Sequence, residues 1–143
     1  MATMFPAYRR GAPGDLPAIA AIQDSVPEAA HWNPADYLEH DLWVAEPASA
    51  TLAAFVVIRH LAPGECEILN LAVAPAFRRK HIASALFSTA LRGFLGDVFL
   101  EVRESNHAAQ KFYKSLGFQA VSTRADYYSA PAEAAIVMKF HSC

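Results

Sequence analysis

The stretch that decides the fold is EILNLAVAPAFRRKHIASALF, residues 67–87. Its opening apolar run predicts a strand over Glu67–Val73, which Ala74-Pro75 ends. The basic triplet Arg78-Arg79-Lys80 then leads into a helix predicted from Ile82 to Gly93. Such a junction suits a phosphate, because the helix N-terminus presents unpaired N–H groups next to positive charge. Taken alone, the segment is equally typical of a solvated basic loop before an ordinary helix.

A second stretch, LEVRESNHAAQKFYKSLGF, covers residues 100–118. It predicts a strand over Val98–Val102 and a helix over His107–Leu116, which Ser105 or Asn106 caps and Gly117 ends. The two stretches together place a strand, a helix, a strand and a helix in succession, which is typical of a partly parallel sheet.

Two residues of the second stretch are candidates for acid–base chemistry. Glu101 lies inside an apolar strand, where lost hydration favours uptake of a proton, as a general base needs. The alternatives are a glutamate that faces solvent and one that pairs with Arg103. Tyr113 is spaced to face the sheet, and its alternative is an ordinary buried tyrosine of the core.

The rest of the chain supplies the other elements of a mixed α/β fold with helices covering the sheet. The additional strands are predicted at Phe5–Arg10, Leu42–Glu46, Thr51–His60, Phe118–Tyr128 and Ala134–Phe140, and the additional helices at Asp15–Ser25 and Pro34–Asp41. The strand Thr51–His60 is almost continuously apolar, so we expect it to be central. No repeat or linker interrupts the chain, and we expect one domain over residues 1–143.

Composition narrows the possible functions. With 143 residues and 54% hydrophobic content, the chain can bury a core without disulfides. The net charge of −2 gives no general attraction to nucleic acid or anionic membranes, so neither is an expected partner. The two cysteines and six scattered histidines match no metal spacing, and no metal is expected. We find no signal peptide or membrane-spanning run, and expect a reduced, cytoplasmic protein.

The two stretches together resemble the GNAT acetyltransferase superfamily. Within it, they are most similar to the RimI-type enzymes, which acetylate the N-terminal alanine of a ribosomal protein. The likeness covers roughly Glu67 to Phe140 and includes Asp126-Tyr127-Tyr128, whereas the first sixty residues agree only in their order of elements. The resemblance implies an α+β GNAT fold with a mixed central sheet of about seven strands, a V-shaped splay between the fourth and fifth strands, and four helices.

The resemblance also implies a site for acetyl-CoA, the acetyl donor. Backbone groups of Leu71, Ala72 and Val73 then hold the pantetheine arm and the acetyl carbonyl. The other implied contacts are Asn106 and the phosphate loop with the start of its helix: Arg78, Arg79, Lys80, His81, Ile82, Ala83 and Ser84. His81 departs from the pattern, because the family has glycine there and a side chain can obstruct the approach of the backbone to the phosphates.

By the same resemblance, a neutral amine attacks the acetyl thioester directly while both substrates are bound. Glu101 corresponds to the general base, and Tyr113 to the residue that protonates the departing thiolate. Tyr127 and Tyr128 belong to the segment that flanks the acceptor groove in RimI-type enzymes, and Trp32 lies in the loop that shapes its other wall. We therefore expect the acceptor to be the N-terminal amine of a peptide or protein.

Two other functions stay open at this point. One is a GNAT enzyme acting on a small amine, such as a polyamine, an amino acid or an amino sugar. The other is a non-catalytic acyl-CoA-binding module, of which His81 would be a sign. The retained Glu101 and Tyr113 favour an enzyme, since a binding module needs neither. The sequence is compatible with a monomer or a homodimer.

Overall fold

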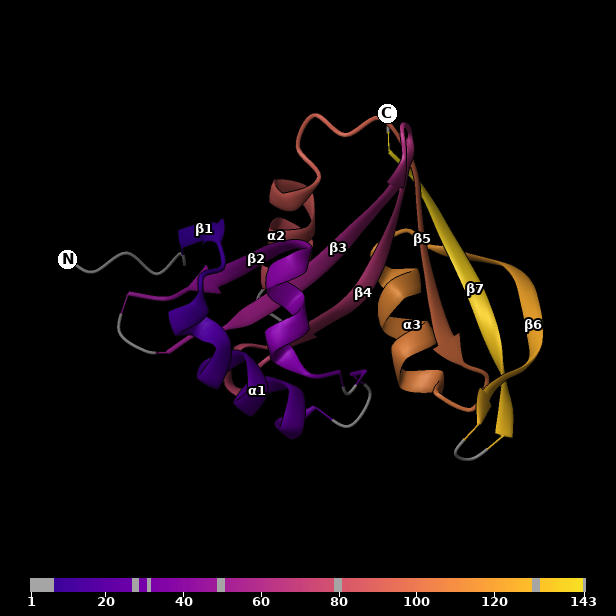
Figure 1. The fold of residues 1–143 in the computed structure, drawn as a ribbon, viewed down its shortest axis with the longest axis horizontal. Coiled ribbons are helices and arrows are strands. Elements are labelled where there is room, and N and C mark those ends of the chain that lie inside the picture. Colours follow the sequence, from indigo (N-terminus) through magenta and orange to yellow (C-terminus); the bar gives the residue numbers. More distant parts are fainter. Residues whose placement is uncertain are drawn as a thin grey trace. The chain divides into compact units, whose positions relative to one another are not determined.

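The computed structural model describes residues 7–26, 29–30, 32–48, 51–78, 81–129 and 132–142. Its seven strands form a sheet in the order β1-β2-β3-β4-β5-β7-β6. The chain divides into two compact units: a first unit of Met1–His60 with Ile68–Gly93, and a second unit of Leu61–Glu67 with Phe94–Cys143 (Figure 1). The expectation of a single domain stays a prediction.

The order of elements predicted from the sequence is confirmed, and every strand begins and ends within a few residues of its predicted bounds. The α-helices are α1 (Leu16–Ser25), α2 (Ile82–Ala90) and α3 (His107–Ser115). The strands are β1 (Ala7–Arg10), β2 (Asp41–Glu46), β3 (Ala54–Ala62), β4 (Glu65–Val73), β5 (Gly96–Arg103), β6 (Gln119–Ser129) and β7 (Ala132–Ser142). Phe5 and Pro6, which the first predicted strand included, lie outside the described residues.

The helix predicted from Pro34 is shorter and tighter than an α-helix. It is the 3-10 helix η2 (Pro34–Glu39), and Asn33 caps it by accepting a hydrogen bond from the N–H of Ala35. Two one-turn 3-10 helices, η1 (Pro13–Asp15) and η3 (Pro75–Phe77), precede α1 and α2. With η2 counted, the four predicted helical segments are all present.

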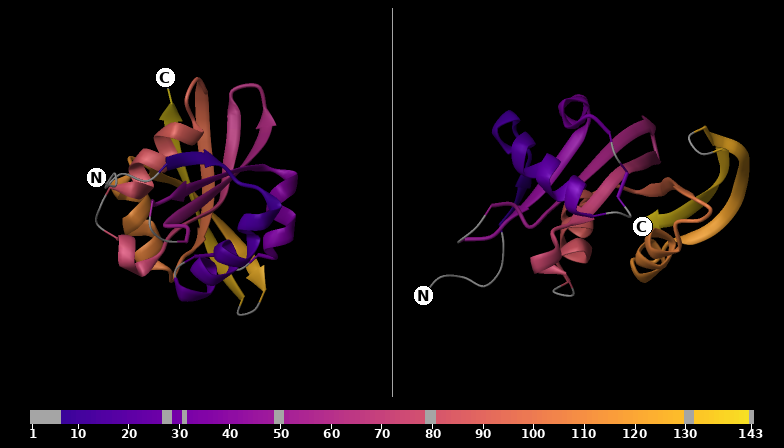
Figure 2. Two further views of the ribbon diagram at one scale, coloured as in Figure 1. Left: turned by 90° about the vertical axis from the view of Figure 1, so that its left-hand side faces the viewer. Right: turned by 90° about the horizontal axis from the view of Figure 1, so that it is seen from below.

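The first unit is built around β3. Antiparallel pairing joins β1 to β2 and β2 to β3. Helices α1 and η2 cover one face of these strands and α2 covers the other (Figures 1 and 2). As a result, every side chain from Ala54 to Ile58 is fully buried, whichever face it points to. This confirms the expected central place of the apolar strand.

The second unit consists of β5, β7 and β6, with α3 and the beginning of β4. Strand β5 pairs antiparallel with β7 from Gly96 to Arg103, and β7 pairs with β6. Helix α3 is joined to β7 by ring contacts that run from Tyr113 through Phe118 to Phe140. Gly117 ends the helix with a φ of +105°, the left-handed stop that the sequence predicts.

The parallel pairing of β4 with β5 is short. It joins Glu65–Glu67 to Asp97–Phe99, and the described residues give no ladder pair between these strands beyond it. The pairing begins where the N–H of Asp97 donates to the carbonyl of Gly64 at 2.9 Å. A Cβ on Gly96 would lie 2.2 Å from that carbonyl oxygen, so the close approach requires glycine. The remainder of β4, Ile68–Val73, belongs to the first unit.

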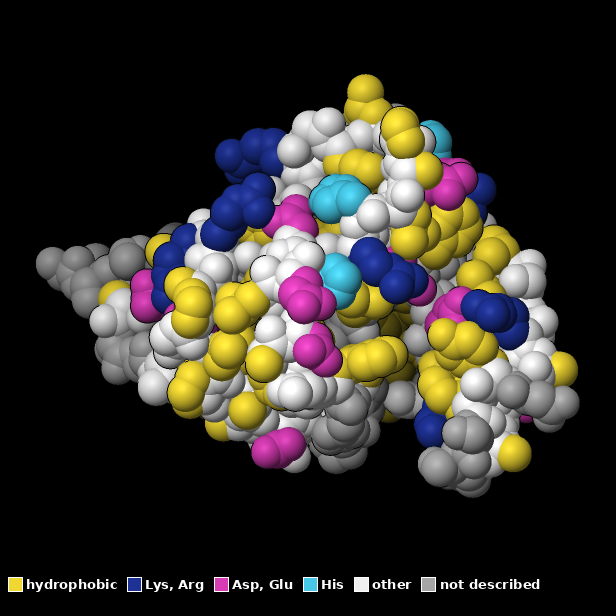
Figure 3. Space-filling model, in the orientation of Figure 1, with side chains coloured by type: hydrophobic (Ala, Val, Ile, Leu, Met, Phe, Trp, Pro, Cys, Tyr) yellow, Lys and Arg dark blue, Asp and Glu magenta, His cyan; other side chains and the backbone are white. Residues whose placement is uncertain are grey.

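No helix among the described residues is both long enough and apolar enough to span a lipid bilayer. On the face drawn in Figure 3, cationic, anionic and histidine side chains are interspersed over the first unit. One such group surrounds Asp41, which pairs with Arg10 and with His60 and accepts from the indole N–H of Trp43.

Candidate active site

Glu101 lies in β5, where the side chains of its neighbours Leu100 and Val102 are buried. Its own side chain is 15% exposed, and its two carboxylate oxygens differ in their surroundings. Nη1 of Arg124 donates to Oε1 at 2.6 Å, whereas Oε2 is buried with no hydrogen-bond partner among the described residues. The sequence left open an ion pair of Glu101 with Arg103. A pair does form, and its cation is Arg124.

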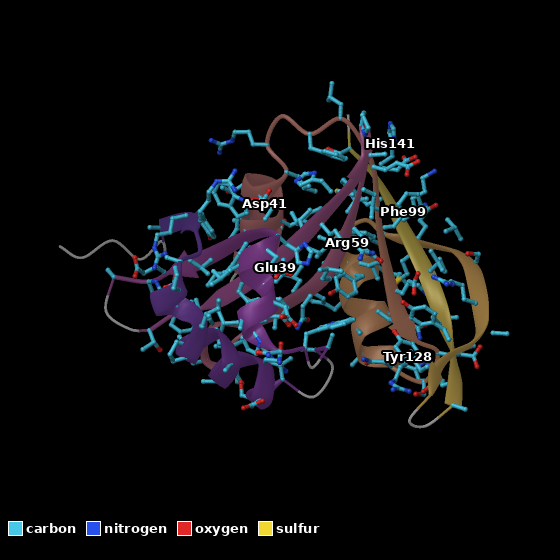
Figure 4. The ribbon with its side chains drawn as sticks, in the orientation of Figure 1. Glu39, Asp41, Arg59, Phe99, Tyr128 and His141 are labelled. Atoms are coloured by element: carbon cyan, nitrogen blue, oxygen red, sulfur yellow. The ribbon has the colours of Figure 1, made fainter. Side chains whose placement is uncertain are left out.

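Two tyrosines surround this ion pair. The guanidinium of Arg124 lies 4.4 Å from the ring centre of Tyr127, and that of Arg103 lies 4.2 Å from the ring centre of Tyr128. The two rings meet edge to face at 5.0 Å. The hydroxyl of Tyr128, whose side chain is labelled in Figure 4, reaches the backbone carbonyl of Glu101 at 3.5 Å. Tyr127 and Tyr128, two of the three residues predicted to contact the acceptor, therefore lie beside Glu101, the predicted base.

A β-bulge explains this arrangement. The register of β6 against β7 shifts between Arg124 and Tyr128, so the residues between them are out of step with the ladder. Burial first, then a side-chain hydrogen bond with Glu101, and then the negative charge of Glu101 raise the pKa of the Tyr127 hydroxyl. That hydroxyl consequently stays protonated at neutral pH and is able to donate a hydrogen bond.

Helix α3 carries the other two predicted residues of the second unit. Asn106 caps the helix, because its Oδ1 accepts from the N–H of Ala109 at 3.1 Å. Tyr113, one side of which packs on Phe118, is 7% exposed, and burial raises the pKa of its hydroxyl. The hydroxyl is therefore protonated at neutral pH in the free protein. Its burial agrees with both readings of the sequence, and its chemical role stays a prediction.

The predicted phosphate loop is described in part. Arg79 and Lys80 lie outside the described residues, and the structure resumes at His81. His81 is exposed and has a φ of +59°, which makes it the one non-glycine residue in the described ranges with left-handed backbone. Glycine adopts this conformation without steric cost. The residue before α2 therefore needs left-handed backbone, which is a second reason for the glycine of the GNAT pattern at this position.

The start of α2 offers backbone donors. The first intrahelical bond runs from the N–H of Ala85 to the carbonyl of His81 at 3.1 Å. The N–H groups of Ile82, Ala83 and Ser84 precede that bond, so they have no partner within the helix. The side chains of Ile82 and Ala83 are buried and hold the helix in place. These N–H groups fit a pyrophosphate. Arg78, which follows η3, precedes His81 by three residues.

The C-terminal end of β4, just before η3, contains Leu71, Ala72 and Val73. These residues lie beyond the segment of β4 that pairs with β5. Leu71 and Ala72 are buried. The N–H of Leu71 donates to Oδ1 of Asn70 at 3.0 Å, so this backbone donor is already engaged. Trp32, the remaining predicted acceptor residue, belongs to the first unit and is 54% exposed.

Sequence reasoning missed the residues that hold the Trp32 loop. Asn70 and Gln23 are 3% and 4% exposed, and both bond to loop backbone: Asn70 to Ala30, and Gln23 to the carbonyl of Trp32. The hydroxyl of Tyr37 donates to Gln23. The signal in the sequence was an asparagine inside the apolar run EILNLAV, because a polar side chain at such a position needs partners.

Known proteins agree with this arrangement of elements. Residues 12–118 match the model of the acetyltransferase (GNAT) family. A [ribosomal protein bS18]-alanine N-acetyltransferase of Haemophilus ducreyi is 38% identical over 85 residues, which cover 54% of this chain and 58% of the relative. The chain thus spans under two thirds of the length of that relative. A protein of the same name from Salmonella typhimurium is 32% identical over 87% of this chain and 89% of its own.

A solved structure extends the likeness to the whole fold. The ribosomal-protein-S18-alanine N-acetyltransferase of Escherichia coli superposes with a TM-score of 0.73 at 27% identity, covering 94% of this chain and 92% of that one. The agreement in fold includes the mixed sheet with its parallel β4–β5 pair.

Proposed function

Because the chain belongs to the acetyltransferase (GNAT) family, we propose that it transfers the acetyl group of acetyl-CoA to the N-terminal amine of a peptide or protein. The observation that carries the proposal is Glu101, a carboxylate whose buried Oε2 has no partner among the described residues. The relatives from Haemophilus ducreyi and Salmonella typhimurium, named for acetylation of a protein's alanine, support the choice of acceptor.

Glu101 acts on the acceptor. An N-terminal amine arrives largely as an ammonium ion and is not nucleophilic until it loses a proton. Oε2 of Glu101 has lone pairs to receive that proton, directly or through one water. Arg124 holds Oε1 and thereby fixes the carboxylate, so that Oε2 is the oxygen left for the amine. The neutral amine then attacks the acetyl carbonyl while both substrates are bound.

Tyr113 completes the proton balance. Its buried hydroxyl retains its proton and gives it to the sulfur of CoA as the C–S bond breaks. The ammonium loses two protons in all. One passes to Glu101 and from there to solvent, and the other replaces the proton that Tyr113 has given up. Amide and thiol are the products, and neither cysteine takes part.

Acetyl-CoA is held by backbone groups more than by side chains. The N–H groups of Ile82, Ala83 and Ser84 receive the pyrophosphate at the positive end of α2, and Arg78 adds charge. The edge of β4 at Leu71–Val73 receives the pantetheine arm, and backbone donors there meet the negative charge that develops on the carbonyl oxygen. Asn106, the cap of α3, is the further side chain proposed to contact acetyl-CoA.

A panel of acceptors tests the proposal. The full chain is incubated with acetyl-CoA and peptides that begin with Ala, Ser, Met or Gly, and in parallel with lysine, spermidine and glucosamine. Thiol release and mass spectrometry report turnover, and peptides with a blocked N-terminus serve as the control. We expect acetylation of free N-termini. A preference for the small amines would overturn the acceptor, and binding of acetyl-CoA without turnover of any amine would leave a binding module.

A further inference from the structure

We propose that Asn70 and Gln23 are positioning residues, which hold the loop around Trp32 against β4 so that the exposed indole of Trp32 can select the acceptor. The part concerning selection rests on the proposed function. The part concerning the loop does not, because it is a statement about hydrogen bonds within the first unit.

Asn70 ties the loop to the strand with a single side chain. Its Oδ1 accepts from two backbone N–H groups, that of Ala30 at 3.2 Å and that of Leu71 at 3.0 Å. Its Nδ2 returns a hydrogen bond to the carbonyl of Ala30 at 2.7 Å. Ala30 is therefore held through both of its backbone groups. The side-chain amide of Asn70 also binds the N–H of Leu71, the first of the residues expected to hold acetyl-CoA.

Gln23 reaches the loop from α1. Its Nε2 donates to the carbonyl of Trp32 at 2.7 Å. Its Oε1 accepts from Nδ2 of Asn70 at 3.1 Å and from the hydroxyl of Tyr37 at 2.5 Å. Helix α1, η2, the loop and β4 thus meet in one buried network, in which every side-chain oxygen and nitrogen of Gln23 has a partner.

Such a network restrains the backbone of Ala30 and of Trp32. A buried amide that loses its partners costs about 1–3 kcal/mol, so other positions of these two residues are disfavoured. Trp32 is nevertheless 54% exposed, although its carbonyl is held by Gln23. A rigidly supported, exposed tryptophan is typical of a contact residue, because binding then costs little conformational entropy.

The loop is tested first, without activity. In Asn70→Leu, whose side chain has similar volume and no polar atom, the N–H of Ala30 loses its acceptor. We expect its hydrogen exchange to accelerate by at least about tenfold, while amides within α2 keep their protection. Gln23→Met is the milder variant and leaves the bonds between Asn70 and Ala30 in place. Unchanged exchange at Ala30 in Asn70→Leu would overturn the positioning of the loop.

Acceptor selection is tested by a double-mutant cycle with a peptide that begins with alanine. Trp32→Ala and Gln23→Met are each expected to lower kcat/KM by about tenfold through KM, with the affinity for acetyl-CoA unchanged. Because Gln23 acts through Trp32, the double variant should be little worse than either single one. Independent, multiplicative effects would overturn the proposal.

Two further outcomes keep the alternatives apart. Val57→Ala leaves a cavity in the same core and removes no hydrogen bond of the network, so it lowers stability and is expected to leave the acceptor KM unchanged. A KM raised equally by Val57→Ala would show that Gln23 contributes only stability, which would overturn the proposal. If the wild-type chain acetylates no peptide, the proposed function and the selecting role of Trp32 fall together, and exchange at Ala30 still decides whether the loop is positioned.

Discussion

At the scale of single residues, the mechanism depends on an asymmetry within one carboxylate. Oε1 of Glu101 is engaged by Arg124, and Oε2 is buried and unpaired among the described residues. Arg124 lies on the exposed side of β6 and can be replaced without opening the core, so its contribution is separable from folding.

Arg124→Gln removes the positive charge and keeps a hydrogen-bond donor. Without the charge-assisted hydrogen bond, the carboxylate of Glu101 is held less firmly at Oε1, so Oε2 is less precisely placed for the amine. We expect kcat/KM with a peptide that begins with alanine to fall by about tenfold, with the affinity for acetyl-CoA unchanged. Lys139→Gln is the matched control, since Lys139 pairs with Asp97 at 3.5 Å in the same unit. An unchanged kcat/KM in Arg124→Gln would refute the role of Arg124.

At the scale of elements, α2 begins with a residue in the conformation of glycine. His81 has the left-handed backbone that glycine adopts without steric cost, and it is exposed. We therefore expect the ring to point away from the donors at the helix start.

His81→Gly relieves left-handed backbone and is expected to raise the free energy of unfolding by about 1 kcal/mol. The dissociation constant for acetyl-CoA should change by less than about threefold, as measured by calorimetry. Gly93→Ala, beyond the other end of α2, is the converse control: its φ is +82° and a Cβ there meets nothing, so it should lose a similar stability. Binding more than about tenfold tighter in His81→Gly would show that the ring obstructs the phosphates.

Elements were also the scale at which the sequence was most informative. Apolar runs and turn residues predicted each strand, because burial and turn chemistry are local properties of the chain. They did not distinguish the 3-10 helix η2 from an α-helix. They offered Arg103 and not Arg124 as a partner of Glu101, since the contact with Arg124 depends on the pairing of β6 with β7. The network of Asn70 likewise joins segments that are far apart in sequence.

At the scale of the molecule, the predicted site residues are divided between two units. The first unit contains the N–H groups at the start of α2, the strand end Leu71–Val73, and Trp32. The second unit contains Glu101, Asn106, Tyr113 and the two tyrosines of β6. Strand β4 contributes to both units, and the family match over residues 12–118 includes parts of each. Neither unit by itself contains the complete set of predicted residues.

The most direct test of acetyl transfer with Glu101 as the base compares wild type and Glu101→Gln. Thiol release from acetyl-CoA is followed over a range of pH with a peptide that begins with alanine, and acetyl-CoA binding is measured by calorimetry. We predict that wild type turns over and that the variant binds acetyl-CoA equally well. The variant should lose about 10² to 10⁴ in kcat, most severely at low pH, where more of the amine is protonated. Equal rates for the two proteins at every pH would contradict the account.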